Sequence, residues 1–183
     1  MTTTAIDIDP ALKAYIDQQL EVLRERQPDN RVTLVVFSGD LDRQLASLVI
    51  ATGAAAMGLD VSIFYTFWGL TALKKRTRLG PKTLKEKMFA LMTPRRLGAM
   101  PVSKLNMGGV GRVMLKSMMR EKQVASIEEL FDLARQMDVK MIACTMSMDA
   151  MGVAKEELVD GLEYGGVAAF MADASRSRFS LFI

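Results

Sequence analysis

The chain has 183 residues, half of them hydrophobic and a quarter charged, with one cysteine, no histidine and a formal net charge of +3. This length and composition indicate one folded domain with a sizeable core and exclude a disordered chain. Without histidine there is no Ser–His–Asp or Cys–His pair, and no zinc site is expected. A single cysteine cannot form an internal disulfide, which favours a reducing compartment.

The first predicted elements are a helix and a strand–helix–strand unit. A helix is expected from Asp9 and Pro10 to about residue 27, followed by a strand at 32–37, a helix at 41–57 and a strand at 61–65. The continuous β-branched run at 32–37 is typical of a strand buried on both faces, and therefore of a parallel sheet. Asp60 interrupts the uncharged stretch around it, so we expect buried core there rather than a membrane span.

A basic, methionine-rich insertion is predicted at residues 74–122. The surrounding stretch 71–123 holds 14 Lys/Arg, two acids and seven methionines, a net charge of +12, whereas the remaining residues carry −9. Three roles stay open: packing against the chain's own core or a sister subunit, recruiting an acidic partner or anionic substrate, and contacting an anionic membrane surface. Nucleic acid is not a predicted partner, because Phe89 is the only aromatic residue of the stretch.

The last part of the chain continues the α/β pattern. Ser126 and Glu129 predict a capping box that begins a helix. A strand at 139–143, a short helix ending at Gly152, helices at 155–161 and 166–175 and a strand at 179–183 follow. We therefore predict a single domain over 1–183, a three-layer α/β sandwich with a mainly parallel sheet, a helical N-terminal extension over 1–30 and the basic insertion.

Cys144 is the one nucleophile with a defined position. It ends the predicted strand at 139–143, where ligands bind in open α/β sheets. If a helix starts at Thr145, the backbone amides of Thr145, Met146 and Ser147 favour negative charge at the sulfur. Sulfur transfer through a persulfide needs neither histidine nor a second cysteine, whereas acyl transfer and two-cysteine peroxidase chemistry do. The alternative is a cysteine that serves only as a small buried hydrophobe.

Other candidate positions carry weaker signals. Five residues that follow the first two strands are candidates to line a pocket at the same edge, with core packing as the alternative: Ser38, Gly39, Tyr65, Phe67 and Trp68. The glycines at 108–111 resemble a phosphate-binding loop, but no strand precedes them, so a hinge or tight turn is the competing interpretation. No cofactor and no metal ion is predicted.

Several blocks together resemble the DsrE/DsrF-like family, in the branch of DsrE-type sulfurtransferases sometimes called peroxiredoxin-like. These blocks are FSGDLDRQLASLVIATGAAAMG, FYTFWGL, LNMGGVGRVMLKSMM, IACTMSMDAMGV and DGLEYGGVAAFM. The resemblance runs from about residue 32 to 171 and implies a flavodoxin-like fold, a homo-oligomer and cytoplasmic sulfur trafficking with TusA-like carriers or rhodaneses. It places the family's sulfur-binding cysteine at Cys144. Glutamine is common in this family at the position that Thr145 occupies here, so the polar contacts to a persulfide differ. With one cysteine, this chain cannot relay sulfur internally.

Two main hypotheses therefore stand beside each other. In the first, the protein is a sulfur carrier or sulfurtransferase that holds a persulfide on an accessible Cys144; whether it turns over or only carries sulfur is left open. In the second, it is a non-catalytic interaction module that docks to a membrane surface or an acidic partner through the basic insertion. A third hypothesis, a nucleotide-binding regulator, depends on the glycine cluster alone.

Overall fold

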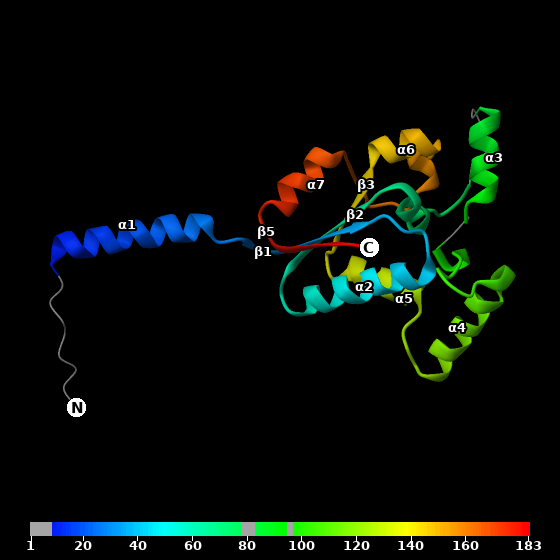
Figure 1. The fold of residues 1–183 in the computed structure, drawn as a ribbon, viewed down its shortest axis with the longest axis horizontal. Helices are drawn as coiled ribbons and strands as arrows, with labels where there is room; N and C mark the ends of the chain where they lie inside the picture. Colours follow the sequence, from blue (N-terminus) through cyan, green and yellow to red (C-terminus); the bar gives the residue numbers. More distant parts are fainter. Residues whose placement is uncertain (1–8, 78–82, 95–96) are drawn as a thin grey trace.

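A five-stranded parallel sheet forms the centre of the protein (Figure 1). The structure is a computed structural model and describes residues 9–77, 83–94 and 97–183. The strand order is β4-β3-β2-β1-β5, and each neighbouring pair is parallel. The strands are β1 (Asp29–Val36), β2 (Asp60–Tyr65), β3 (Lys140–Cys144), β4 (Glu163–Gly165) and β5 (Ser177–Phe182). The predicted strands at 32–37, 61–65, 139–143 and 179–183 are thereby confirmed to within a few residues.

Helices cover both faces of this sheet. Alternate strand residues point to opposite faces, so Leu34, Ile63 and Met141 face one layer. That layer is built by α2 (Leu41–Ala56) and α5 (Ile127–Gln136), and α7 (Val167–Ala174) packs on the other face. The predicted three-layer α/β architecture is confirmed.

The position of α7 follows from the strand order. The chain steps from β1 to β2 to β3 in one direction, and β4 then connects back to β5 at the opposite edge. Because a crossover between parallel strands is right-handed, reversing its direction moves the connecting helix to the other face. This is why α7 lies opposite α2 and α5.

A polar cluster at the amino ends of the strands fixes the last turn of α7. Asp173 accepts a hydrogen bond from Arg31 at 2.6 Å and one from Ser62 at 3.2 Å, and lies 3.5 Å from the amine of Lys140. Burial alone would lower the pKa of Lys140, but Glu163 and Asp173 outweigh burial and raise this pKa. The cluster ties β1, β2 and β3 to one end of α7.

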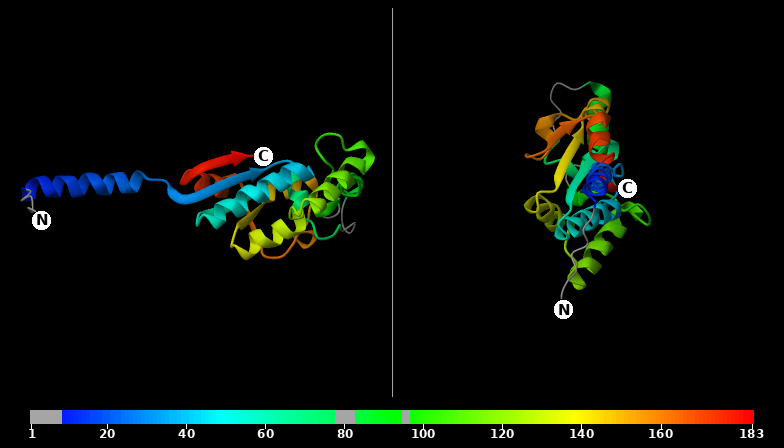
Figure 2. Two further views of the ribbon diagram at one scale, coloured as in Figure 1. Left: turned by 90° about the horizontal axis from the view of Figure 1, so that it is seen from below. Right: turned by 90° about the vertical axis from the view of Figure 1, so that its left-hand side faces the viewer.

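The N-terminal helix α1 (Pro10–Arg26) extends away from the domain (Figure 2). Asp9 caps it, accepting a hydrogen bond from the backbone amide of Ala11 at 2.8 Å. Its apolar residues, including Leu12, Ile16 and Leu20, are exposed in the single chain. The helix is as predicted, although its apolar stripe has no partner within the described residues of the chain.

The basic insertion forms helices at the carboxyl end of the sheet. They are α3 (Leu84–Met92), η2 (Leu97–Ala99), η3 (Met107–Gly109) and α4 (Val110–Glu121), and η1 (Phe67–Leu73) connects β2 to the insertion. Gly69 lies so close to β1 that an added Cβ would be 2.0 Å from the carbonyl oxygen of Val36. The close approach lets η1 pack directly on the end of β1. Among the described residues, no helix has the length and apolar character needed to cross a membrane.

The last third of the chain differs from the prediction in one helix and one strand. The helix expected at 155–161 is only the short turn η4 (Lys155–Glu157), because the next residues pair with the end of η1: Val159 donates to the Leu73 carbonyl, and Leu158 bridges to Lys74. Strand β4 was not predicted. By contrast, α6 (Thr145–Met151) ends at Gly152 as expected, with φ of 62° at that glycine.

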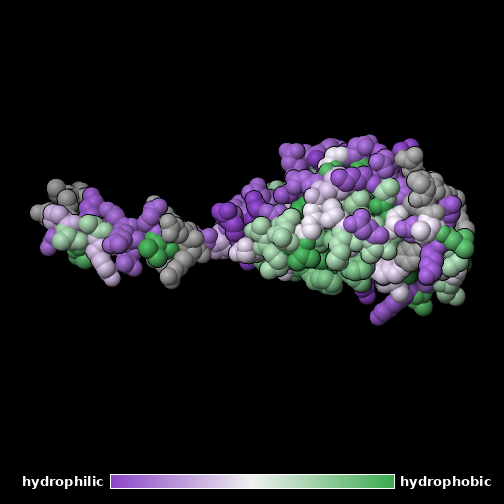
Figure 3. Space-filling view, turned by 90° about the horizontal axis from the view of Figure 1, so that it is seen from above, coloured by the Kyte–Doolittle hydropathy of each residue, from purple (hydrophilic) through white to green (hydrophobic). Residues whose placement is uncertain are grey.

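The surface over α7 and β5 is apolar (Figure 3). Val167 and Met171 of α7 and Phe182 of β5 are exposed. β5 is also an edge strand of the sheet. Exposed apolar side chains beside an unpaired strand edge are typical of a surface that another polypeptide covers.

Candidate functional site

The carboxyl ends of the three central strands meet at one edge of the sheet. Ser38 follows β1, Thr66 follows β2 and Cys144 ends β3. The hydroxyls of Thr66 and Ser147 are joined by a hydrogen bond of 2.8 Å, which connects the end of β2 to the first turn of α6. Ligands of open parallel sheets bind at this edge.

Cys144 is the residue at which β3 passes into α6. It occupies the N-cap position with φ of −70° and ψ of 112°, as the strand-to-helix pattern predicts. Its side chain makes no capping hydrogen bond to the first turn of α6. The backbone amides of Thr145, Met146 and Ser147 lie in that turn, where amides have no partner within the helix. The Cys144 sulfur and these amides therefore lie at the same strand–helix junction, but the side chain is turned away from the amides and toward the sheet face.

The Cys144 side chain is buried between the sheet and α7. It is 1% exposed and belongs to an apolar cluster with Phe64 and Ile142. Phe170 of α7 packs against this cluster, with its ring centroid 5.6 Å from that of Phe64. The expectation of an accessible sulfur is therefore wrong for the single chain in this conformation, because α7 covers the face on which Cys144 lies.

Three of the five candidate pocket residues line a common cavity. Ser38, Gly39 and Trp68 surround an open cavity of about 420 Å³. The insertion supplies one wall through Thr93, Pro94 and Pro101, and Phe37, Asp40, Arg43 and Thr71 complete the lining. Cys144 is not among these residues, so the cavity and the cysteine are separate features of the same sheet edge.

The two remaining candidates lie elsewhere. Tyr65 shares a strand face with Ile63 and is fully buried in the core under α2, where burial raises the pKa of its hydroxyl. Phe67 packs beside Phe37 in a tilted arrangement, with ring centroids 5.6 Å apart. Because side chains alternate along β2, Tyr65 points into the core and not into the cavity.

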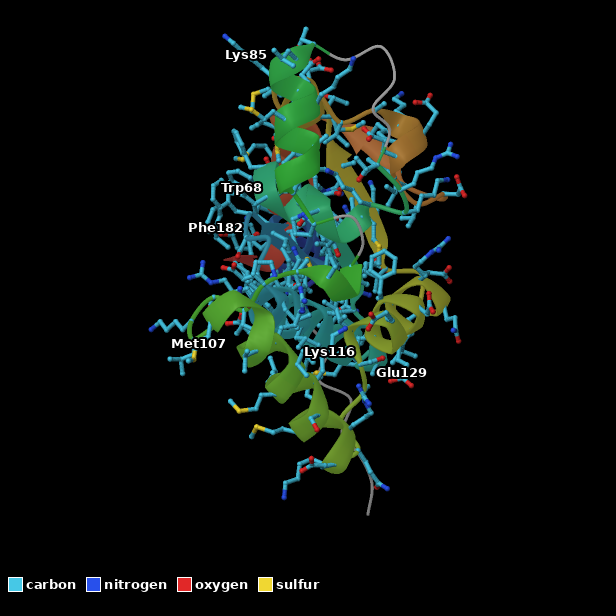
Figure 4. The ribbon with its side chains drawn as sticks, turned by 90° about the vertical axis from the view of Figure 1, so that its right-hand side faces the viewer. Trp68, Lys85, Met107, Lys116, Glu129 and Phe182 are labelled. Carbon is cyan, nitrogen blue, oxygen red and sulfur yellow. The ribbon has the colours of Figure 1, made fainter. Side chains whose placement is uncertain are left out.

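An aromatic contact from the last strand was not predicted. Phe182 stacks on Phe37 with ring centroids 6.0 Å apart, and Figure 4 shows Phe182 and Trp68 on the same side of the carboxyl edge. This contact arises because Val35, the residue two before Phe37, pairs with Phe182 in the parallel ladder between β1 and β5, and that pairing depends on the strand order. No local sequence pattern reports that order.

The other chemical candidates find less support in the geometry. The glycines at 108–111 connect η3 to α4 and follow no strand, and Gly108 and Gly109 have φ of 67° and 103°. A tight turn explains Gly108 and Gly109, and Gly111 packs closely against the backbone of Leu105. Among the residues that the structure describes, no cluster of three His, Cys, Asp or Glu side chains could hold a metal ion.

Comparisons with known proteins identify the family of the chain. The model of the DsrE/DsrF/DrsH-like family matches residues 28–182. The chain is 44% identical to the uncharacterized protein YrkE of Bacillus subtilis (strain 168), over 84% of this chain and 96% of that protein. It is 38% identical to the sulfur carrier protein DsrE2 of Allochromatium vinosum, over 84% of this chain and 98% of that protein.

A solved structure, that of the ychN protein from E. coli, aligns with 84% of this chain and 99% of its own, at a TM-score of 0.47 and 14% identity. The family match covers all five strands of the sheet and includes Cys144. The chain belongs to the DsrE/DsrF/DrsH-like family.

Proposed function

We propose that this protein is a cytoplasmic sulfur carrier that holds sulfane sulfur as a persulfide on Cys144. The proposal is supported by family membership and by 38% identity to a relative named as a sulfur carrier. The observation that carries it is the position of the only cysteine, at the carboxyl end of β3 and at the N-cap of α6. No other side chain of the chain can form a persulfide.

The transfer chemistry requires no further catalytic group. The Cys144 thiolate attacks the outer sulfur of a donor persulfide, one S–S bond forms as another breaks, and the donor leaves as its thiolate. In the onward step, an acceptor thiolate attacks the outer sulfur of the Cys144 persulfide and releases the Cys144 thiolate. Each step is a displacement that conserves charge and electrons. The absence of histidine and of a second cysteine is compatible with this reaction.

The backbone amides of Thr145, Met146 and Ser147 are our candidates to stabilise the persulfide anion. The hydrogen bond between Ser147 and Thr66 holds this first turn of α6 against β2. A persulfide is longer than a thiol by one sulfur atom. On rotating out of the Phe64–Ile142 cluster, its terminal sulfur comes within reach of the same amides.

Sulfur exchange also requires the cover over Cys144 to open. The residue in the way is Phe170 of α7, a helix of eight residues. Its outer face and the neighbouring β5 are apolar and exposed (Figure 3). We propose that this surface binds sister subunits in a homo-oligomer, and that exchange with a TusA-like carrier or a rhodanese accompanies displacement of α7.

The experiment is persulfide loading followed by intact-protein mass spectrometry. The protein is incubated with polysulfide or a persulfidated carrier, and the expected product gains the mass of sulfur atoms in a form that a thiol reductant removes. Cys144→Ser is the matched variant and is expected to gain none. Equal loading of Cys144→Ser, or no loading of either the wild type or an Asp173→Ala variant in which the end of α7 is released, contradicts the proposal.

A further inference from the structure

Helix α4 of the basic insertion presents an amphipathic surface that the sulfur chemistry does not use. The helix runs over Val110–Glu121 at the carboxyl end of the domain and projects from it (Figures 2 and 4). It contacts the domain through one side: Gly111 is buried, Leu115 packs against the main core, and Met119 lines the groove toward α5. At Gly111, an added Cβ would lie 2.0 Å from the carbonyl oxygen of Leu105. The side opposite this contact is therefore fixed in its outward orientation.

The outward side of α4 is an apolar stripe. Val110, Val113, Met114 and Met118 recur at the spacing of one helix face and are each 53–65% exposed. In Figure 4, sulfur-bearing side chains project from α4 away from the domain. Ser117 and Glu121 lie on the same face of the helix as the stripe, and Ser117 donates a hydrogen bond to Glu121 at 3.2 Å.

A row of cations lies along one side of this stripe, and two of them, Lys116 and Arg120, also line the groove toward α5. Arg112, Lys116 and Arg120 follow one another at intervals of four residues, which aligns them in a row beside the stripe. Arg120, Lys104 before the helix and Lys122 after it are exposed, and Arg112 and Lys116 are partly buried. Residues 97–124 contain these five basic residues and one acid, Glu121.

The contacts of the flanking cations leave most of this charge at the surface. Lys116 pairs with Glu128 at 3.4 Å, and Arg112 donates one hydrogen bond to the Ala99 carbonyl at 2.6 Å. The Arg112 side chain also lines an open hollow of about 670 Å³ beside Met114. A guanidinium at the rim of an apolar surface suits a phosphate above an acyl layer.

The apolar stripe and the row of cations together indicate which kind of partner binds α4. A second copy of the chain placed stripe to stripe would bring two rows of like charges together, which opposes association. An acidic protein would satisfy the cations but has no general need of an exposed methionine-rich stripe. An anionic lipid surface satisfies both, since phosphates meet the cations and the headgroup–acyl boundary takes the apolar side chains.

We propose that α4 is an interfacial anchor that binds the domain to anionic membrane surfaces, with its apolar stripe entering the headgroup–acyl boundary and Arg112, Lys116 and Arg120 contacting lipid phosphates. This anchoring is independent of Cys144. It places the carboxyl edge of the sheet, from which α4 projects, toward the membrane.

The test is co-sedimentation of the full-length protein with vesicles. One set is phosphatidylcholine alone and the other contains about one third phosphatidylglycerol; we expect binding only to the second set, and release at about 1 M salt, where the screening length falls to about 3 Å. Arg120→Gln with Lys122→Gln is expected to weaken partitioning about 25-fold, from roughly fivefold per cation. Val113→Ser removes a half-exposed side chain of the stripe and is expected to weaken it by about tenfold.

Controls separate the anchor from general charge and from sulfur chemistry. Lys13→Gln with Arg178→Gln removes two exposed cations elsewhere and should lower partitioning by less than about twofold. Cys144→Ser should bind vesicles as the wild type does, so failure of the sulfur proposal leaves this result unchanged.

Three results would overturn the anchor. One is equal partitioning to both vesicle sets or to neither. Another is binding to polyglutamate that depends on Arg120 and Lys122 but not on Val113, without vesicle binding, which marks an acidic partner. The third is a concentration-dependent dimer in sedimentation that Val113→Ser abolishes, again without vesicle binding, which marks a contact between copies.

Discussion

The Asp173 cluster predicts how Cys144 becomes accessible. Asp173→Ala removes the hydrogen bond from Arg31, that from Ser62 and the pairing with Lys140. The partly exposed Arg31 contributes about 1.5 kcal/mol, Ser62 about 1 kcal/mol, and Lys140, whose side chain is 39% exposed and screened by solvent, about 0.5 kcal/mol. We therefore expect the free energy of unfolding to fall by about 3 kcal/mol.

The same substitution loosens the end of α7, the helix that covers Cys144. If α7 opens locally, the free energy of this opening falls by the same amount. The open population, and with it the rate of Cys144 labelling by a small disulfide reagent, then rises about a hundredfold. Urea unfolding followed by circular dichroism gives the first quantity, and absorbance of the released thiol gives the second. Labelling that does not change with low urea identifies local opening rather than global unfolding.

The control and the contradicting result are defined by the structure. Asp160 forms an exposed ion pair with Lys75, so Asp160→Asn should leave both stability and labelling unchanged within error. If Asp173→Ala lowers stability as expected but Cys144 labelling stays at the wild-type rate, α7 is not the cover that controls access. A loss below about 1 kcal/mol would instead show that the cluster does not hold α7.

Three further substitutions test local features, each by urea unfolding. Ser126→Ala removes the N-cap of α5 and should cost about 1 kcal/mol; no loss would show that the capping box is dispensable. Gly69→Ala forces a Cβ onto the carbonyl oxygen of Val36 and should cost at least about 3 kcal/mol, and wild-type stability would show that η1 can move off β1. Burial alone would raise the pKa of Asp42, but hydrogen bonds from Ser103 outweigh it and lower this pKa below 3.8. Asp42→Asn should therefore cost about 1 kcal/mol at neutral pH, and its difference from the wild type should vanish as the pH falls through the lowered pKa; a difference that persists in acid would contradict this origin.

Most of the fold can be predicted from local sequence patterns. β1 and β2 are β-branched runs that suit strands buried on both faces, and Ser126 with Glu129 forms the predicted capping box. β4 could not be predicted, since Glu163–Gly165 is short, mostly exposed and without periodicity. The incomplete helix at 155–161 reflects tertiary pairing with η1, which outweighs the helical preference of the segment.

The site was predictable in position and not in exposure. Cys144 at a strand–helix junction follows from local pattern, and so do Ser38 and Trp68 at the same edge. The burial of Cys144 depends on Phe170, whose helix reaches this face only because the β4–β5 connection reverses the strand order. The same reversal brings Phe182 to Phe37. Such long-range placement has no counterpart in the spacing of neighbouring residues.

The pairing of β1 with β5 has a consequence for how the chain is made. The Thr33 hydroxyl is hydrogen-bonded to that of Ser180, 147 residues later, so one side of β1 stays unpaired until β5 has left the ribosome. Contacts this distant slow folding, and an open apolar strand invites association with other nascent chains. The interval between the synthesis of β1 and that of β5 is therefore the period in which we expect this protein to need a chaperone most, and slowing translation should raise its demand for one.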